Sequence, residues 1–218
     1  MQSPKAEPRS PNYSPRQRYS LGKDVQNRIR ETKQALRDQV RAVLSQIPQE
    51  QRMAASARAR ALLEKQARWQ AARSVLFFAP LPEELDVWPL LASALTAGKQ
   101  VALPRFVAAT RRYEVCWILS PETDVRAGHF GIREPSGHCA RVARDKLDLI
   151  LVPGLALDLQ GCRLGRGKGY YDQLLGVWRG TTCGVAFDEQ IVDEIPLEPH
   201  DVRLNCILTP TVCVDVKA

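Results

Sequence analysis

The chain has 218 residues, of which 44% are hydrophobic, and it carries a formal net charge of +7 at pH 7. A chain of this length buries a large core without needing disulfides or structural metals, and one large α/β domain is the default expectation. Residues 1–30 hold five of the seven net positive charges, so the remainder is nearly balanced and lacks the fold-wide basic surface of a nucleic-acid-binding protein.

The first 22 residues predict a disordered, basic tail rich in proline and serine. This segment has almost no apolar side chains, so it cannot bury enough surface to offset the entropy lost on ordering. It also lacks the apolar core of a secretory signal, and its prolines suit an amphipathic targeting helix poorly. No other run is long enough to span a membrane. We expect residues 23–218 to form a single domain of a soluble, cytoplasmic protein, with organellar targeting as the alternative.

The cysteines favour the same compartment, because they are scattered and show neither a C-x-x-C pair nor histidines at zinc-site spacing. Most lie in apolar, strand-like runs, where a free cysteine is usually a small buried hydrophobe. Cys162 lies beside a basic loop that could lower its pKa, but no histidine nearby in sequence could act as its base. We interpret it as incidental.

Two helices are predicted at the start of the domain. The first runs from about Asp24 to Gln46 and carries Lys33, Arg37 and Arg41 as a row on a different face from its apolar residues. A solvated face explains such a row, although a bound triphosphate would turn its self-repulsion into attraction. The second helix follows Pro48 and runs to about Ala72. Its predicted inner face consists of Met53, Ala57, Ala61 and Leu62.

The next segments alternate between strands and helices. A short buried strand, Val75–Ala79, leads into a loop with Glu83, Glu84 and Asp86, and ligands bind at such carboxyl ends of strands in open α/β sheets. A helix over Val87–Ala97 and further strands follow, of which Tyr113–Leu119 alternates polar and apolar residues as a half-exposed edge strand does. The later strands are expected at Gln100–Leu103, Leu147–Val152, Thr182–Phe187, Cys206–Thr209 and Val212–Val216. The order predicts a three-layer α/β/α sandwich around a mostly parallel sheet.

The stretch Asp148–Trp178 combines a strand, a glycine-rich basic loop and the start of a helix. Five of the six residues from Leu147 to Val152 are apolar and Pro153 closes the run, which is typical of a strand buried on both faces. Glycines then interleave with basic residues before an amphipathic segment opens: Gly161, Gly165, Gly167 and Gly169 with Arg163, Arg166 and Lys168. Backbone N–H groups, positive charge and a helix dipole converge here, which indicates a phosphate-binding loop.

This loop differs from the two familiar glycine-rich phosphate loops. No Ser or Thr follows Lys168 as in a P-loop, and the glycines lie about a dozen residues beyond the strand rather than directly after it. The alternative is a flexible, solvated surface loop. Against it stands Asp172, one turn into the helix, because a carboxylate beside a phosphate is repulsive unless a cation lies between them. The combination favours a nucleotide with magnesium.

The segment RLGRGKGYYD, Arg163–Asp172, closely resembles the signature of the 5-formyltetrahydrofolate cyclo-ligase family, also called methenyltetrahydrofolate synthetase. The preceding DLILVPGLALD is similar to the family's strand and turn. Shorter similarities lie at Lys33–Arg37, Leu103–Arg105, Gly131–Pro135 and His200–Asp201, so the resemblance spans roughly residues 30–210.

The resemblance implies a set of site residues. Those implied for ATP binding are Lys33, Arg37, Arg163, Leu164, Gly165, Arg166, Gly167, Lys168, Gly169, Tyr170 and Tyr171, with Arg166 and Lys168 also catalytic. Those implied for binding the folate substrate are Glu84, Phe130, Arg166, Gly167, Lys168, Gly169 and Tyr170. Asp172 and Asn205 are the implied metal ligands. Asn205 stands where some family members carry an aspartate. The amide lacks the negative charge of that aspartate, and Asp158 or Asp201 could supply it instead.

The implied reaction uses ATP and Mg²⁺ to cyclise 5-formyltetrahydrofolate to 5,10-methenyltetrahydrofolate, with release of ADP and phosphate through a phosphorylated formyl group. It implies a small-molecule substrate and no specific nucleic acid, membrane or obligate protein partner. Two other classes stay open. One is a sugar-phosphate isomerase or CoA-transferase-like enzyme, and the other is a non-catalytic anion- or RNA-binding protein that acts through the basic tail.

Overall fold

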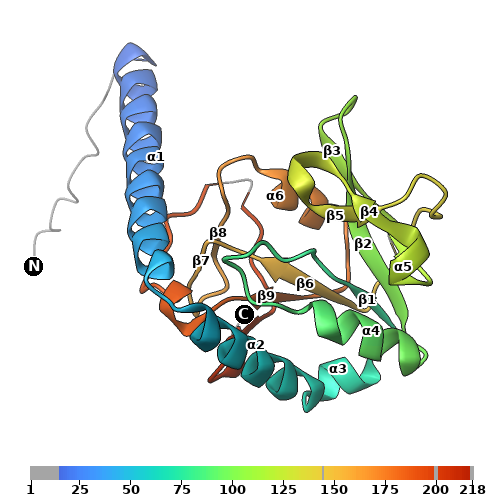
Figure 1. Ribbon diagram of the computed structural model, residues 1–218. Coiled ribbons are helices and arrows are strands. Elements are labelled where there is room, and N and C mark those ends of the chain that lie inside the picture. Colours follow the sequence, from blue (N-terminus) through green and yellow to red (C-terminus); the bar gives the residue numbers. More distant parts are fainter. Residues whose placement is uncertain (1–14, 144, 199–200, 217–218) are drawn as a thin grey trace, which may run out of the picture.

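Runs rich in branched apolar residues form a seven-stranded sheet in the order β11-β10-β9-β6-β1-β2-β3 (Figure 1). The computed structural model describes residues 15–143, 145–198 and 201–216, with the side chains of residues 15–23 and of Phe130 outside the description. All neighbouring strands pair in parallel except the two edge pairs, β2–β3 and β10–β11. The strands are β1 Ser74–Leu76, β2 Gln100–Val107, β3 Arg112–Ile118, β6 Leu149–Pro153, β9 Thr181–Val185, β10 Cys206–Leu208 and β11 Cys213–Asp215. The predicted mostly parallel sheet and the antiparallel edge strand β3 are confirmed.

Helices cover both faces of this sheet, but unequally. Along β6, Leu149 and Leu151 join one apolar cluster while Ile150 and Val152 join another, as the alternation of a strand buried on both faces requires. The first cluster packs under α1 Pro15–Ser45, α2 Gln49–Glu64, α3 Ala67–Ala71 and α4 Trp88–Thr96. The second packs under the short α6, Tyr170–Leu175, and the connecting segments. The α/β class is confirmed, and its second helical layer is thin.

Two small ribbons shape the region around the carboxyl ends of the strands. The hairpin of β4 Val125–Ala127 and β5 Arg133–Pro135 lies beside β2 and β3 (Figure 1), with α5 Pro121–Asp124 before it and the 3-10 turn η1 His129–Gly131 at its tip. The ribbon of β7 Ala156–Leu157 and β8 Arg163–Leu164 leads from β6 into the basic loop. A second 3-10 turn, η2, spans Asp188–Gln190.

The two long helices differ from their predicted boundaries and faces. Helix α1 begins at Pro15 rather than near Asp24, and proline is favoured at a first helical position. The predicted disorder of the tail stays a prediction for residues 1–14, which lie outside the described part. In α2 the predicted inner face was wrong at Met53, Ala57 and Ala61, which are exposed, whereas Leu62 packs against the core as predicted. The buried side of α2 is Ala55, Ser56, Ala59 and Leu63. The prediction failed because alanines are spread around the whole helix and blur its amphipathic pattern.

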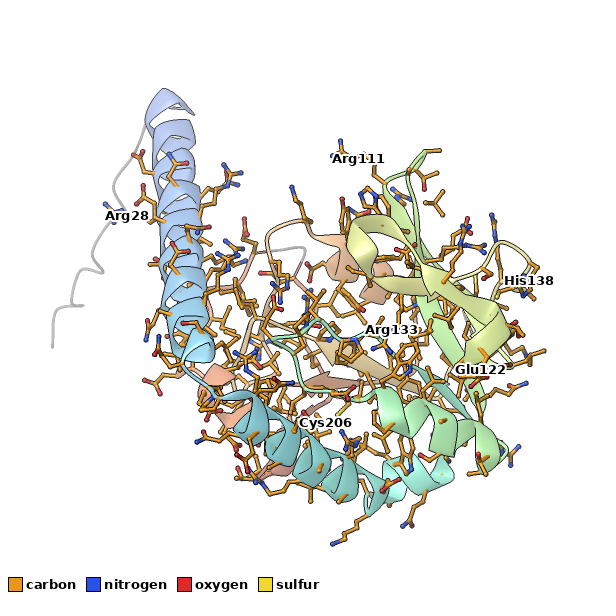
Figure 2. The ribbon with its side chains drawn as sticks, viewed as in Figure 1. Arg28, Arg111, Glu122, Arg133, His138 and Cys206 are labelled. Carbon is orange, nitrogen blue, oxygen red and sulfur yellow. The ribbon has the colours of Figure 1, made fainter. Side chains whose placement is uncertain are left out.

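Several labelled side chains illustrate the difference between the interior and the surface. Figure 2 shows Cys206 within the body of the molecule and Arg28, Arg111 and His138 at its margin. Among the described residues, no helix combines the length and the apolar character that crossing a bilayer requires.

Candidate active site

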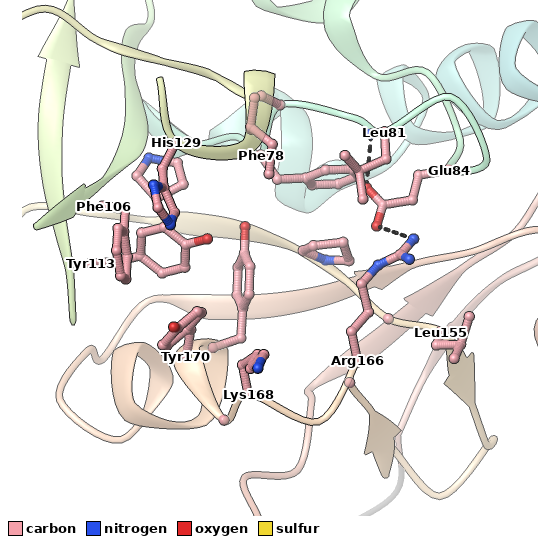
Figure 3. Close-up of a pocket in the computed structure, with 18 of the residues that line it drawn as sticks. Phe78, Leu81, Glu84, Phe106, Tyr113, His129, Leu155, Arg166, Lys168 and Tyr170 are labelled. Atoms are coloured by element: carbon pink, nitrogen blue, oxygen red, sulfur yellow. Dashed lines mark hydrogen bonds and ion pairs between the residues drawn. The ribbon is translucent and has the colours of Figure 1, made fainter. Parts of the chain in front are cut away.

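A pocket of about 220 Å³ lies where β1, β2 and β6 end. The segment after β1 contributes Phe78 and Glu84, β2 contributes Phe106, and the basic loop contributes Arg166 and Lys168 (Figure 3). Because parallel strands end at the same edge of a sheet, segments distant in sequence converge on this pocket.

One wall of the pocket is aromatic. The Phe106 ring stacks on His129 at a centroid distance of 4.9 Å and an interplanar angle of 19°, and it lies 5.2 Å from the Tyr170 ring. Tyr113 contacts Tyr170 and Tyr171 with centroid distances of 5.6 and 5.8 Å. Burial, and then the negative charge of Glu134, raise the pKa of Tyr113 to about 12, so its hydroxyl is neutral at physiological pH.

The opposite wall carries a carboxylate paired with the basic loop. Arg166 Nη2 lies 3.3 Å from Glu84 Oε1 and 2.9 Å from Glu83 Oε1, and Leu81 N–H donates to Glu84 Oε2 at 3.1 Å (Figure 3). Burial raises the pKa of Glu84, although the Leu81 N–H and the Arg166 charge act in the opposite direction. Arg166 and Glu84 therefore join the basic loop to the segment after β1 on this wall of the pocket.

The basic loop presents an exposed cation next to glycines with left-handed backbone. Lys168 is exposed, and no carboxylate of the described residues pairs with it. Gly167 and Gly169 have φ values of 97° and 65°, which L side chains rarely adopt. Arg37 from α1 donates through Nε to the Gly165 carbonyl at 3.0 Å and so holds the loop against the helix.

Asp172 and Arg163 form a largely buried ion pair at the base of the loop. Arg163 Nη2 donates to Asp172 Oδ1, and the side chains are only 4% and 17% exposed. A Cβ at position 165 would lie 2.9 Å from Arg163 Nη1, so any other residue there would displace the guanidinium from its present position. The Arg163 Nε is buried and has no hydrogen-bond partner among the described residues. Leu164 is buried within β8, so only its backbone faces the loop.

Lys33 does not face the pocket. It is 5% exposed, and its Nζ lies 2.6 Å from Asp201 Oδ2 and 2.9 Å from Glu198 Oε2. A solvated face, one of the two explanations of the row through Lys33, Arg37 and Arg41, does not hold at Lys33, because this residue lies on the buried side of α1. The apolar pattern hid this because a paired lysine can occupy a core-facing position. The ATP contact implied for Lys33 stays a prediction.

Among the described residues, no hydrogen bond or ion pair joins Asn205 to Asp172. Asn205 directly precedes β10, and its Oδ1 accepts hydrogen bonds from Thr182 N–H at 2.8 Å and from the Thr182 hydroxyl at 2.9 Å. Thr182 is near the amino end of β9, whereas the basic loop follows the carboxyl end of β6. We therefore leave Asn205 out of the metal site.

The two proposed replacements for that missing charge are also engaged elsewhere. The Asp158 carboxylate accepts backbone N–H groups of Gln160, Cys162 and Ile195, and Asp201 pairs with Lys33. Burial raises the pKa of Cys162 to about 11, which agrees with an incidental thiol. The side chain of Phe130 and the residue His200 lie outside the described part.

Sequence reasoning missed most of the aromatic wall. Phe106, Tyr113 and His129 come from β2, β3 and η1, so no single stretch of sequence contains them. A signal existed in the β2–β3 pairing, which places Phe106 opposite Tyr113. Glu134 was also missed. It is buried and accepts hydrogen bonds from the N–H groups of Phe106 and His129. Burial raises the pKa of Glu134, although those two hydrogen bonds act in the opposite direction.

An aromatic pocket that meets a cationic, glycine-rich loop at the carboxyl edge of a parallel sheet defines an α/β enzyme for a flat, ring-containing substrate and an anion. The chain belongs to the 5-formyltetrahydrofolate cyclo-ligase family, whose family model matches residues 29–210. The resemblance predicted from the loop signature is thereby confirmed.

Individual relatives agree with this assignment. The 5-formyltetrahydrofolate cyclo-ligase of Mycolicibacterium smegmatis is 38% identical over 143 residues, which are 63% of this chain and 74% of that protein. The mouse 5-formyltetrahydrofolate cyclo-ligase is 26% identical over 191 residues, covering 83% of this chain and 94% of its own. The solution structure of Aquifex aeolicus 5,10-methenyltetrahydrofolate synthetase superposes with a TM-score of 0.77 at 30% identity, covering 85% of this chain and 93% of that one.

Proposed function

We propose that this protein catalyses the ATP-dependent cyclisation of 5-formyltetrahydrofolate to 5,10-methenyltetrahydrofolate. The observation that carries the proposal is the junction of the aromatic wall with the basic loop. Tyr170 belongs to both, since its ring contacts Phe106 and its backbone follows Gly169 at the start of α6. A flat heterocycle on the aromatic side and a phosphate at the loop would therefore meet in one pocket.

The reaction requires folate and ATP to bind side by side, because the formyl oxygen is a poor leaving group. The oxygen attacks the γ-phosphorus of ATP, the bond to the bridging oxygen breaks, and ADP departs. N10 of the folate then attacks the activated formyl carbon, N10 loses its proton, and phosphate leaves with the former formyl oxygen. Phosphoryl transfer of this kind requires positioning and charge neutralisation rather than covalent help from the protein.

The basic loop supplies that neutralisation. Lys168 has no competing carboxylate among the described residues and is the cation best placed to contact the transferred phosphoryl group. Arg166 can join it once its contacts to Glu83 and Glu84 are exchanged for phosphate oxygens. Arg37 keeps the loop in place through the Gly165 carbonyl, while Lys33 contributes to ATP binding by fixing α1.

The folate is held by the two walls. The heterocycle stacks against the ring cluster that includes Phe106 and Tyr170, and Phe130 remains part of the proposed folate site. Glu84 accepts N–H groups of the heterocycle after Arg166 turns towards phosphate. Binding of both substrates thus replaces the ion pairs of Arg166 with Glu83 and Glu84 by contacts of Arg166 with phosphate and of Glu84 with folate.

Asp172 fits a magnesium ion as a single carboxylate ligand. It lines the pocket, and only its Oδ1 is engaged by Arg163, which leaves Oδ2 available. Mg²⁺ in nucleotide sites is commonly held by one or two carboxylates with substrate phosphates and waters. Such an ion would neutralise phosphate charge next to Asp172.

The test mixes purified protein with 5-formyltetrahydrofolate and Mg-ATP and follows the near-ultraviolet absorbance of the methenyl product. We expect an increase that requires ATP and that is lost in Lys168→Ala. Turnover without ATP, or no turnover although folate and ATP both bind, would contradict the proposal. An isomerase or CoA transferase would not consume ATP, and binding through the tail would disappear on deletion of residues 1–22 while an enzyme would stay active.

A further inference from the structure

Three side chains of metal-ligating type gather away from the active site. One carboxylate oxygen of Asp124, a ring nitrogen of His138 and the Cys139 sulfur all lie within 4.8 Å of one another. His138 Nε2 is 3.0 Å from Asp124 Oδ1, and the Cys139 thiol lies 3.4 Å from the Asp124 carbonyl oxygen. The sequence pattern did not reveal this group, because Asp124 lies well before the adjacent His138 and Cys139 and the three match no standard zinc spacing.

The Asp124 carboxylate is held in a fixed orientation. Its Oδ2 accepts the N–H groups of Leu119 at 2.7 Å and Ser120 at 3.1 Å, and the Thr123 hydroxyl lies 3.2 Å from Oδ1. Its Oδ1 is thereby directed towards His138. The hydrogen bond with His138 and then those backbone N–H groups hold the pKa of Asp124 well below its usual range. Ligating carboxylates in metal sites are oriented by hydrogen bonds of this kind.

One of the three ligands is exposed to solvent and the other two are buried. The His138 side chain is 64% exposed, and Figure 2 shows it at the margin of the molecule, on the side of β4 and α5. Cys139 is 8% exposed and Asp124 is equally buried. An ion would enter from solvent past the imidazole and rest on two buried atoms.

The donor set selects the class of ion. Nitrogen, sulfur and carboxylate oxygen together suit Zn²⁺ and similar transition metals, whereas Mg²⁺ and Ca²⁺ prefer oxygen alone. Tetrahedral zinc bonds place neighbouring ligand atoms about 3.3 to 3.6 Å apart. Because all three ligand atoms lie within 4.8 Å of one another, a shift of the thiolate by about 1 Å is enough to reach that geometry.

The cluster lies at the base of the β4–β5 hairpin. Asp124 precedes β4, while His138 and Cys139 follow β5, and Ser136 N–H already donates to the Asp124 carbonyl at 2.6 Å. The tip of the same hairpin places His129 in the active-site pocket. An ion at the base would close the hairpin and steady the wall that it presents to the substrate.

We propose that Asp124 Oδ1, His138 Nε2 and Cys139 Sγ bind one zinc-class divalent ion, with water as the fourth ligand, as a staple at the base of the β4–β5 hairpin. This site is separate from the magnesium position proposed at Asp172, and it does not depend on the proposed reaction.

The test titrates the metal-free full-length protein with Zn²⁺ in competition with a chromophoric chelator. We expect one ion per chain and a loss of affinity of about 100-fold or more in His138→Ala and in Cys139→Ser, beyond the about 10- to 100-fold that loss of an outer-shell partner costs. Cys213→Ser is the matched control, because Cys213 is a partly exposed cysteine on β11, and it should bind like the parent. Co²⁺ in place of zinc should give a thiolate charge-transfer band. Cys139→Ser should abolish this band, and Cys213→Ser should retain it.

Zinc binding that is unchanged in His138→Ala, or a Co²⁺ spectrum without a thiolate band, would overturn the proposal. Absence of any zinc binding by the folded parent protein would also overturn it. If Cys139→Ser does not fold, His138→Ala decides the question, since an exposed side chain is removed there without disturbing the core.

Discussion

Lys33 Nζ lies 2.6 Å from Asp201 Oδ2 and so connects α1 to a loop 168 residues further along the chain. Glu198 adds a second carboxylate 2.9 Å from the same nitrogen. The side chains of Lys33 and Asp201 are only 7% and 9% exposed, so water and salt screen this pair far less than a surface pair. Without the ammonium group, two carboxylates would face each other in a poorly solvated place.

Lys33→Met should therefore lower the free energy of unfolding by about 3 kcal/mol, the cost of leaving a buried charge without its partner. Urea denaturation measures this loss. The control is Arg41→Met, which removes an exposed helix pair with Asp38 and should cost less than about 1 kcal/mol. Equal losses in the two variants would contradict a special role for Lys33.

The same ion group predicts a pH dependence at the alkaline end. Burial lowers the pKa of Lys33, but the hydrogen bonds and charges of Asp201 and Glu198 outweigh it, and the net direction is upwards from 10.5. A raised lysine pKa gives stability that is present below pH 10.5 and is lost as the pH rises through the folded value. The difference in unfolding free energy between the parent and Lys33→Met should accordingly shrink above that pH.

Glu84→Gln should change both the pH dependence of stability and the KM for folate. Because burial raises the pKa of Glu84, its ionisation costs stability as the pH rises from its usual value of 4.5 through the folded value. The amide variant lacks this loss, so its stability should vary less with pH over that window. If Glu84 accepts N–H groups of the folate, the variant should raise KM for folate about tenfold without raising KM for ATP. A parallel increase in both would argue against a folate-specific contact.

The sheet was predictable because its signals are local. The apolar run of β6 indicated a strand buried on both faces, and the alternation in β3 indicated an edge strand. The face of α2 was not predictable, because alanine tolerates both burial and exposure and its arginines do not mark one side. Tertiary packing alone determines that Ala59 is buried and Ala57 exposed.

The site was predictable to the extent that it is contiguous. Arg166 and Lys168 lie in one readable loop. The carboxyl end of β1 pointed to Glu83, Glu84 and Asp86 together, and the family resemblance singled out Glu84. The contact between His129 and Phe106 depends on how the β4–β5 hairpin lies beside β2, which no short pattern encodes. The burial of Lys33 likewise depends on a partner loop near the end of the chain.

Lys168→Ala should abolish most of the activity while leaving the fold intact. The side chain is exposed and pairs with no carboxylate of the described residues, so its removal should change the unfolding free energy by less than about 0.5 kcal/mol. Loss of a cation at the transferred phosphoryl group should reduce kcat by about 100-fold or more. Lys146→Ala, another exposed lysine, is the control and should retain full activity. Normal kcat in Lys168→Ala would remove this residue from the proposed mechanism.

Asp172→Asn should affect both stability and magnesium use. Arg163 is 4% exposed at its side chain, so loss of the counter-charge should cost about 3 kcal/mol. If Asp172 also holds Mg²⁺, the variant should need about tenfold more Mg²⁺ for half-maximal activity. Arg163→Met breaks the same ion pair but keeps the carboxylate, and it should not raise the Mg²⁺ requirement. A shift of equal size in both variants would indicate that Asp172 acts only through Arg163.

Asn205→Asp tests whether position 205 belongs to the metal site. Asn205 Oδ1 already accepts hydrogen bonds from the Thr182 N–H and hydroxyl near the amino end of β9. A carboxylate held by the same two donors adds no ligand at Asp172, and half-maximal activity should need the same Mg²⁺ concentration as in the parent. Asn205→Ala should leave magnesium use unchanged as well, but it should cost about 1 kcal/mol of unfolding free energy because Thr182 loses its acceptor. A lower Mg²⁺ requirement in Asn205→Asp would place this residue back at the active site.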